Sequence, residues 1–163
     1  MPSKSAWLQI RIAPAQKAAL KGLARAAGLD VSAYVLARVL PGAHARFAGL
    51  LRSLASPGDR RFALAELNDF LASCPPSAFA AAVERADLQA LTPLDQNYVA
   101  AMVEQAAGQK GVEPPRWVRG VLPLEVPHFA ASLKSLRLHL LRAAPVAFKR
   151  RNIFIDAGVG ARV

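Results

Sequence analysis

Apolar and polar residues alternate from Trp7 to Ile12, and this alternation constrains the fold more than any other feature of the sequence. A period of two predicts a β-strand with one buried face and one free face. The buried face would hold Leu8, Ile10 and Ile12, and the free face would hold Trp7, Gln9 and Arg11. Gln and Arg pair with adenine and guanine edges in the major groove of DNA. The stretch therefore predicts a strand that can read DNA bases.

A basic helix is predicted directly after this strand. Pro14 cannot donate to a β-ladder but suits the first turn of a helix, so the strand ends there. Apolar residues recur at helical spacing over residues 14–27, and a basic stripe lies beside them at Lys17, Lys21 and Arg25.

A second helix is predicted after a turn at Gly28. Glycine readily adopts the left-handed conformation that ends many helices. Asp30 or Ser32 can then cap the start of the next helix, which Pro41 ends. One strand and two helices bury too little apolar surface to fold alone. We therefore expect a second copy, whose strand pairs antiparallel with the first.

These residues resemble the ribbon-helix-helix family of DNA-binding proteins. The resemblance rests on the alternation over 7–12 and on residues 28–35, and it covers about a quarter of the chain. It implies that a two-stranded ribbon enters the major groove and that backbone amides at the start of the second helix bind a phosphate. The implied DNA-contacting residues are Trp7, Gln9, Arg11, Lys17, Lys21, Val31 and Ser32. Trp7 is bulky for a base-reading position. It can instead contact the sugar-phosphate backbone or a neighbouring dimer. A basic edge strand of an ordinary mixed domain is the competing interpretation.

The positive charge of the chain is concentrated at its two ends. Of 163 residues, 21 are Lys or Arg and 11 are Asp or Glu, which gives a net charge of +10. Residues 1–41 hold six basic residues and one acidic residue. Residues 42–130 hold eight basic and nine acidic residues, and residues 131–163 hold seven basic residues and one acidic residue. Two separate basic regions indicate two separate functions or one long surface for polyanions.

Composition and spacing argue against several classes of protein. No apolar run approaches the roughly eighteen residues of a membrane span, and the N-terminus lacks the apolar core of a signal peptide, so we expect a cytoplasmic protein without membrane contact. Cys74 is the single cysteine and is expected to be a small buried apolar residue. The histidines show no metal-ligand spacing, and no phosphate loop or nucleophile elbow is present. We therefore expect no metal, no cofactor and no catalysis.

The predicted fold class is mainly α, with a ribbon-helix-helix unit over residues 1–41 and a helical bundle over residues 42–113. Bundle helices are expected at 44–54, 60–72, 78–85 and 93–108, separated by proline and glycine. Their apolar faces are wide and follow no fixed repeat, which favours a bundle over a repeat array.

Residues 114–163 are predicted to pack on the bundle as an extended proline-rich crossing, a basic helix and a short β-prone tail. Pro114 and Pro115 favour extended geometry in the residues before them, and Trp117 is expected to pack on the bundle. A long helix is expected over 132–143. Four of its leucines are expected to face inward: Leu133, Leu136, Leu140 and Leu141.

The basic triplet 149–151 and the β-prone run 153–155 have two interpretations. They can close the domain as a turn and a packed segment. Alternatively, they form a partner-binding tail in which the run adds to an edge strand or fills a groove, with the triplet against an acidic site. The residues of this partner-binding tail are Phe148, Lys149, Arg150, Arg151, Ile153, Phe154 and Ile155.

Residues 114–156 also resemble the C-terminal portion of antitoxin-like proteins encoded beside small toxins, through Pro-Pro-Arg-Trp-Val and Phe-Lys-Arg-Arg-Asn-Ile-Phe-Ile-Asp. The two resemblances imply an antitoxin, a homodimer that binds operator DNA, represses its own operon and neutralises a toxin protein through its C-terminal region. A nucleotidyltransferase, an acetyltransferase and a ribonuclease are candidate toxins. The alternative is a stand-alone regulator, or a plasmid partition or relaxosome accessory protein, whose helical body serves oligomerisation. RNA binding by the C-terminal basic helix is a weaker option, because aromatic residues do not interleave with its charges.

Overall fold

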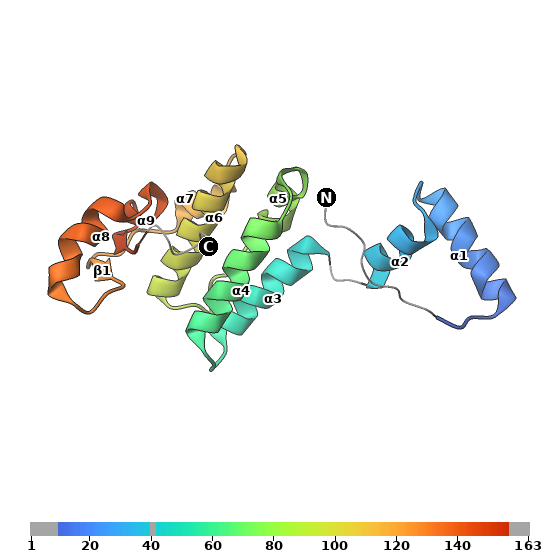
Figure 1. Cartoon of the computed structure of the whole chain (residues 1–163), viewed down its shortest axis with the longest axis horizontal. Coiled ribbons are helices and arrows are strands. Elements are labelled where there is room, and N and C mark those ends of the chain that lie inside the picture. Colours follow the sequence, from blue (N-terminus) through green and yellow to red (C-terminus); the bar gives the residue numbers. More distant parts are fainter. Residues whose placement is uncertain (1–9, 40–41, 157–163) are drawn as a thin grey trace. The chain divides into compact units, whose positions relative to one another are not determined.

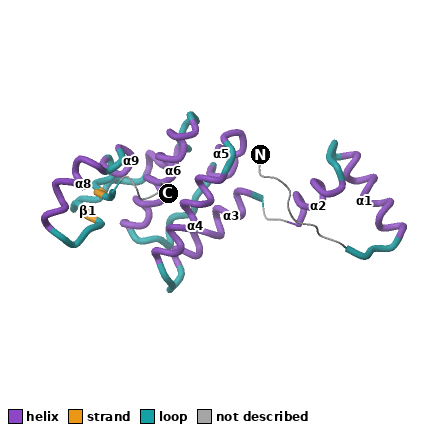
Figure 2. Tube along the Cα trace, in the orientation of Figure 1, coloured by secondary structure: helices purple, strands orange, loops and turns teal. Residues whose placement is uncertain are grey.

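The computed structural model describes residues 10–39 and 42–156, and this part of the chain is mainly helical, as the sequence predicts (Figure 1). The chain divides into two units, Met1–Pro41 and Gly42–Val163. Figure 2 shows that the strand content of the described residues is one small pair in the larger unit. No helix in the ranges 10–39 and 42–156 combines the length and the apolar character needed to cross a bilayer.

The smaller unit holds two helices, α1 (Pro14–Ala26) and α2 (Val31–Val39). The elements of the larger unit are α3 (Ala43–Ala55), α4 (Arg60–Ser73), α5 (Pro76–Val83), α6 (Pro93–Lys110), α7 (Arg116–Gly120), β1 (His128–Phe129), the 3-10 helix η1 (Lys134–Leu136), α8 (Arg137–Ala143), α9 (Val146–Lys149) and β2 (Ile153–Phe154).

Helix α6 is the centre of the larger unit. It buries residues on more than one side, including the polar Asp95 and Asn97, and it contacts α4, α5, α7 and α9. Thr92 caps its start by accepting a hydrogen bond from the backbone N–H of Asp95 (3.2 Å). Gly111 ends it at a φ of +65°, the left-handed conformation that glycine adopts without strain.

Two apolar clusters form the core of the larger unit, and α6 contributes to both. The first joins α6 to α3, α4 and α5 around Phe47, Phe79 and Val103. The second joins the opposite side of α6 to the C-terminal segment through Tyr98, Phe148 and other residues. The residues after α9 are therefore part of the core.

The segment between α6 and α8 is fastened to the bundle by polar side chains. The indole N–H of Trp117 donates to the carbonyl oxygen of Val83 (2.8 Å), and Trp117 packs against the first cluster. The prediction that Trp117 packs on the bundle is confirmed. The buried amide of Asn97 donates to the carbonyl oxygen of Leu122 (3.0 Å). This crossing ends at β1, which pairs in parallel with β2.

The long helix expected over residues 132–143 is shorter than predicted. It consists of one 3-10 turn, η1, followed by the two turns of α8. Leu140 is buried, but three leucines expected to face inward are exposed: Leu133 (63%), Leu136 (41%) and Leu141 (43%). The prediction for these three leucines was wrong. An element this short contacts the rest of the unit through only a narrow stripe of its surface.

Candidate functional site

A glycine turn joins α1 to α2 in the smaller unit. Gly28 has a φ of +67°. Its N–H donates to the carbonyl oxygen of Arg25 (3.1 Å), and the N–H of Leu29 donates to the carbonyl oxygen of Ala24 (3.0 Å). This pair of bonds is a Schellman motif, which requires a residue that tolerates the left-handed conformation. The turn reverses the chain where the sequence predicts it.

Asp30 is the residue that caps α2. Its carboxylate accepts a hydrogen bond from the backbone N–H of Ala33 (2.8 Å). Because the first amides of a helix have no partner within it, the N–H groups of Val31 and Ser32 are the ones left for a ligand. A phosphate there would share the end of α2 with the Asp30 carboxylate. The phosphate-binding role of these two amides stays a prediction.

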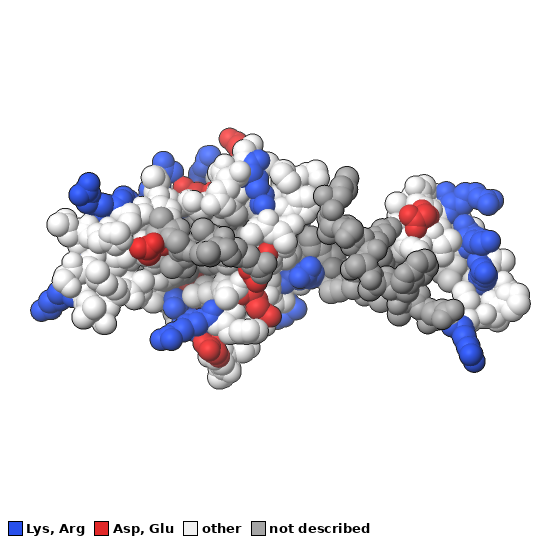
Figure 3. Space-filling view, in the orientation of Figure 1, with Lys and Arg blue, Asp and Glu red and all other residues white. Residues whose placement is uncertain are grey.

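The smaller unit presents both basic and apolar side chains at its surface. Lys17, Lys21 and Arg25 are exposed at intervals of four residues along α1, and Figure 3 shows basic side chains gathered along this helix. Four aliphatic side chains of the unit are also exposed: Ile10 (60%), Ile12 (41%), Leu23 (53%) and Leu29 (44%). A lone copy of this helix pair therefore leaves uncovered much of the apolar surface that a core would use.

The first half of the predicted base-reading strand, residues 7–9, lies outside the described residues. Trp7 and Gln9 fall there, so the structure places neither of them. Arg11 is described and its side chain is exposed, between Ile10 and Ile12. Residues 10–12 form no strand within the described chain.

Four of the seven residues assigned to the partner-binding tail are buried in the protein's own core. Phe148 meets Tyr98 edge to face with ring centroids 6.0 Å apart, and Ile153 and Ile155 are almost fully buried. Arg151 is also buried. A partner cannot reach these four side chains while the unit is folded, so their burial argues against partner binding through them, and the assignment itself stays a prediction. The other interpretation of this run, a packed segment that closes the domain, describes what the structure shows.

The three remaining tail residues lie at or near the surface. Phe154 is half-buried and stacks on Phe129, with ring centroids 4.9 Å apart. Lys149 is half-buried and donates to the carbonyl oxygen of Arg142 (3.0 Å), while Arg150 is exposed and pairs with Glu104. Their role in partner binding stays a prediction.

Arg151 is a buried charged residue of the C-terminal segment. Its guanidinium donates to the carbonyl oxygens of Val118 (2.8 Å) and Val121 (3.3 Å) and to the carboxylate of Glu104 (3.3 Å). Burial lowers the pKa of Arg151, and Glu104 opposes that shift. One side chain thus connects the tail to α6 and to the end of α7.

Residues 133–142 form an exposed surface that is both apolar and basic, which we call the leucine face. Leu138 is its most exposed leucine (71%), and Leu141 lies three residues further on, on the same side of α8. Lys134, Arg137 and Arg142 flank these leucines, and the guanidinium of Arg137 lies over the Phe129 ring at 5.0 Å. The sequence pattern predicted that Leu141 faces inward, so it missed the exposed leucines of this surface.

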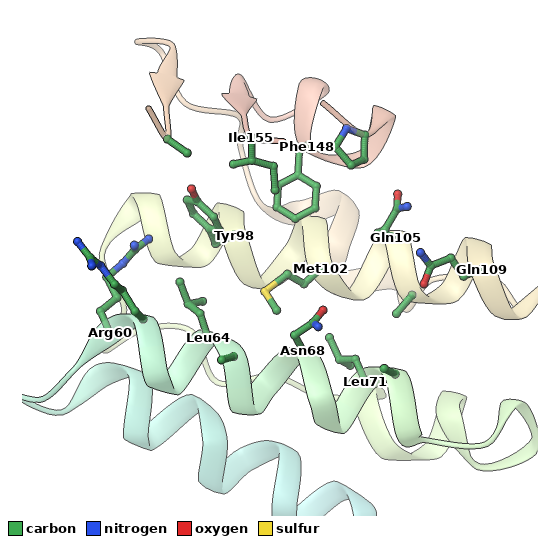
Figure 4. A pocket seen from close by; sticks show the side chains of 16 residues that line it. Arg60, Leu64, Asn68, Leu71, Tyr98, Met102, Gln105, Gln109, Phe148 and Ile155 are labelled. Carbon is green, nitrogen blue, oxygen red and sulfur yellow. The ribbon is translucent and has the colours of Figure 1, made fainter. Parts of the chain in front are cut away.

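A groove lies between α4, α6 and the C-terminal segment (Figure 4). Its volume is about 530 Å³. At one end, Arg60 pairs with the buried carboxylate of Asp95 and lies over the ring of Tyr98 at 4.8 Å. Burial raises the pKa of Tyr98, and burial together with the charge of Arg60 lowers the pKa of His128 beside it. The sequence pattern gave no sign of this groove, because its walls come from three separate parts of the chain.

The described residues contain no candidate metal site. Among them, no three or more His, Cys, Asp or Glu side chains gather closely enough to hold an ion. Cys74 is buried, as expected, and burial raises the pKa of its thiol, so a reactive thiolate is disfavoured there.

Comparisons with known protein families, with curated proteins and with solved structures find no match to this chain. A functional conclusion therefore depends on the two units and their surfaces.

Proposed function

We propose that the smaller unit is a ribbon-helix-helix domain that dimerises and binds operator DNA. The observation that supports this most is the combination of a Schellman turn and a capped second helix with an uncovered apolar surface at Ile10, Ile12 and Leu23. A second copy would cover that surface and supply the partner strand that residues 10–12 lack.

The charge of the smaller unit supports DNA as its ligand. Lys17, Lys21 and Arg25 make a cationic stripe along α1, and Asp30 is the unit's single acidic residue. Lysine and arginine contacts to phosphates supply most of the sequence-independent affinity for DNA. Gln9 and Arg11 would supply the base contacts on the outer side of the ribbon.

Replacing Arg11 with alanine is expected to weaken binding of the full chain to its own upstream DNA by about 1–3 kcal/mol and to relax the preference at one base position. Replacing Lys21 with alanine should weaken binding to all DNA sequences about equally. It should also lower the slope of log affinity against log salt concentration by about one. Arg52→Ala, which removes an exposed arginine from α3, is the control. Salt-titrated fluorescence anisotropy measures each variant, and unchanged specificity in Arg11→Ala would refute the ribbon.

The larger unit, in this proposal, binds and neutralises a toxin protein, so that the whole chain is an antitoxin and autorepressor. What supports a protein partner is the leucine face, where Leu133, Leu136 and Leu138 are exposed beside basic residues. Exposed apolar surface with a charged rim is typical of protein interfaces. The proposal thus keeps the C-terminal region as the binding region but moves the contact from the buried tail to this face.

Leu138→Glu is expected to weaken binding to the product of the adjacent gene by at least roughly tenfold, because it places a carboxylate in the middle of an apolar contact. Co-expression followed by affinity measurement and a growth-rescue assay measures the loss. Leu122→Glu is the matched control, since Leu122 is 82% exposed and lies outside the leucine face. If the adjacent gene product binds neither wild type nor control, the chain is the stand-alone regulator.

A further inference from the structure

We propose that the groove between α4, α6 and the C-terminal segment, named here the α4–α6 groove, binds an amphipathic helix of a partner protein that carries acidic residues at one end. This inference concerns a surface that the proposed DNA and toxin contacts leave unused. It does not depend on the DNA-binding role of the smaller unit.

The shape of the groove fits a helix. In Figure 4, α4 and α6 run in the same direction along it, α4 from Arg60 to Leu71 and α6 from Tyr98 to Gln109. The lining residues of α4 extend from Arg60 to Ala72, which is about 18 Å at 1.5 Å per residue. That length matches roughly three turns of a docked helix. Ala65, Ala72 and Ala106 line the groove, and small side chains let a third backbone approach closely.

Apolar side chains make up much of the groove's lining. Phe148 and Ile155 form its upper wall, and Met102 points into it from α6 (Figure 4). Leu64 and Met102 are half-buried, so they retain apolar surface that an apolar helix face can cover. A helix that docks in such a groove uses anchors at positions i, i+3 or i+4, and i+7.

The charge of the groove selects an acidic occupant. Arg60 and Arg61 stand at one end, and none of the described residues that line the groove is Asp or Glu. Because Asp95 balances the charge of Arg60, the exposed Arg61 supplies the net positive charge at this end. Nη2 of Arg60 is buried and has no hydrogen-bond partner among the described residues, whereas Arg61 is exposed. A carboxylate at this end would bond to the exposed guanidinium of Arg61, a group that holds carboxylates well.

Two exposed apolar helical segments of the chain, α1 and the leucine face, do not complement this charge. Helix α1 carries Lys17, Lys21 and Arg25, and the leucine face carries three basic residues of its own. Either segment of a second copy would bring like charges to Arg60 and Arg61, which is unfavourable. The occupant we infer is therefore a helix of a different, acidic protein.

A display library of helical 14-residue peptides, with variable apolar faces and polar ends, tests this inference on the full chain. Selection on wild type with counter-selection on Ala65→Gln should enrich peptides with the i, i+3/i+4, i+7 apolar pattern and Asp or Glu at one end. Measured by fluorescence anisotropy, the Ala65→Gln variant should bind an enriched peptide on the order of tenfold more weakly than wild type does. Arg61→Glu should weaken it roughly three- to tenfold and favour the same peptide with Lys in place of its acids.

Matched substitutions outside the groove serve as controls. Ala81→Gln on α5 and Arg52→Glu on α3 make the same chemical changes at exposed positions and should leave the affinity unchanged. The inference is overturned if no helical peptide is enriched, or if the enriched peptides bind Ala65→Gln as well as wild type. Binding of dodecanoate in place of peptides would assign the groove to a small anionic amphiphile. Self-association that Ala65→Gln abolishes would assign it to a second copy; both results overturn the inference.

Discussion

Replacing Arg151 with alanine is expected to lower the free energy of unfolding of the larger unit by about 3–5 kcal/mol, the range for breaking a buried ion pair. The side chain of Arg151 is 6% exposed, and its loss leaves the carbonyl oxygens of Val118 and Val121 without their donor. It also leaves the carboxylate of Glu104 with the exposed Arg150 alone. Urea unfolding of the full chain, followed by tryptophan fluorescence, measures the change.

Arg150→Ala is the matched control for this prediction. Arg150 precedes Arg151 and binds the same carboxylate, but its side chain is 69% exposed. Its removal is expected to cost less than about 1 kcal/mol, as is usual for exposed ion pairs. Equal costs for the two variants would contradict a structural role for Arg151. Because Phe148 and Ile153 lie in the same core, deletion of the tail would unfold the unit and could not test partner binding.

The double variant Ile10→Asp/Ile12→Asp is expected to convert the proposed dimer to a monomer and to abolish specific DNA binding. In the proposed dimer these side chains are buried, and each contributes roughly 1.5–3 kcal/mol. Within one chain they are 60% and 41% exposed. Sedimentation at micromolar concentration measures the loss of the dimer, and circular dichroism should show loss of helix from α1 and α2.

Leu122→Asp/Val126→Asp controls for the general effect of two added carboxylates, since both residues are exposed in the larger unit, at 82% and 75%. It should leave the dimer intact. A dimer that survives Ile10→Asp/Ile12→Asp would show that the smaller unit does not assemble through the predicted strand.

The positions of helices α1 to α6 were well predicted because the signals that set them are local, whereas α7 and α9 were not predicted. Prolines, caps and glycines lie within a few residues of the helix ends that they determine, as Pro14, Gly28 and Thr92 illustrate. The backbone of α6 begins at the predicted residue for this reason. Such signals require no knowledge of the rest of the fold.

Exposure of the leucines in residues 133–141 could not be predicted from the same kind of signal. Helical spacing shows which residues share a side, but not how much of that side a neighbouring element covers. The short α8 buries Leu140 and leaves Leu138 and Leu141 at the surface. Only the tertiary contacts distinguish these residues.

The buried tail shows the same limit for polar residues. Three consecutive basic residues normally indicate a solvated surface, and Arg150 follows that rule. Arg151 does not, because Glu104 and the carbonyl oxygen of Val118, 47 and 33 residues away in sequence, meet it in the fold. The α4–α6 groove was missed for a related reason, since its walls are distant in sequence.

Helix α6 has a consequence for how the larger unit opens. Its two sides complete two different apolar clusters, so neither cluster can come apart without exposing a surface of the same helix. Residues 42–156 should therefore lose their structure in one cooperative step, with the amide hydrogens of α6 among the last to exchange with solvent. A cellular protease would find few partly opened forms of this unit, and its turnover would follow the rare event in which the whole unit unfolds.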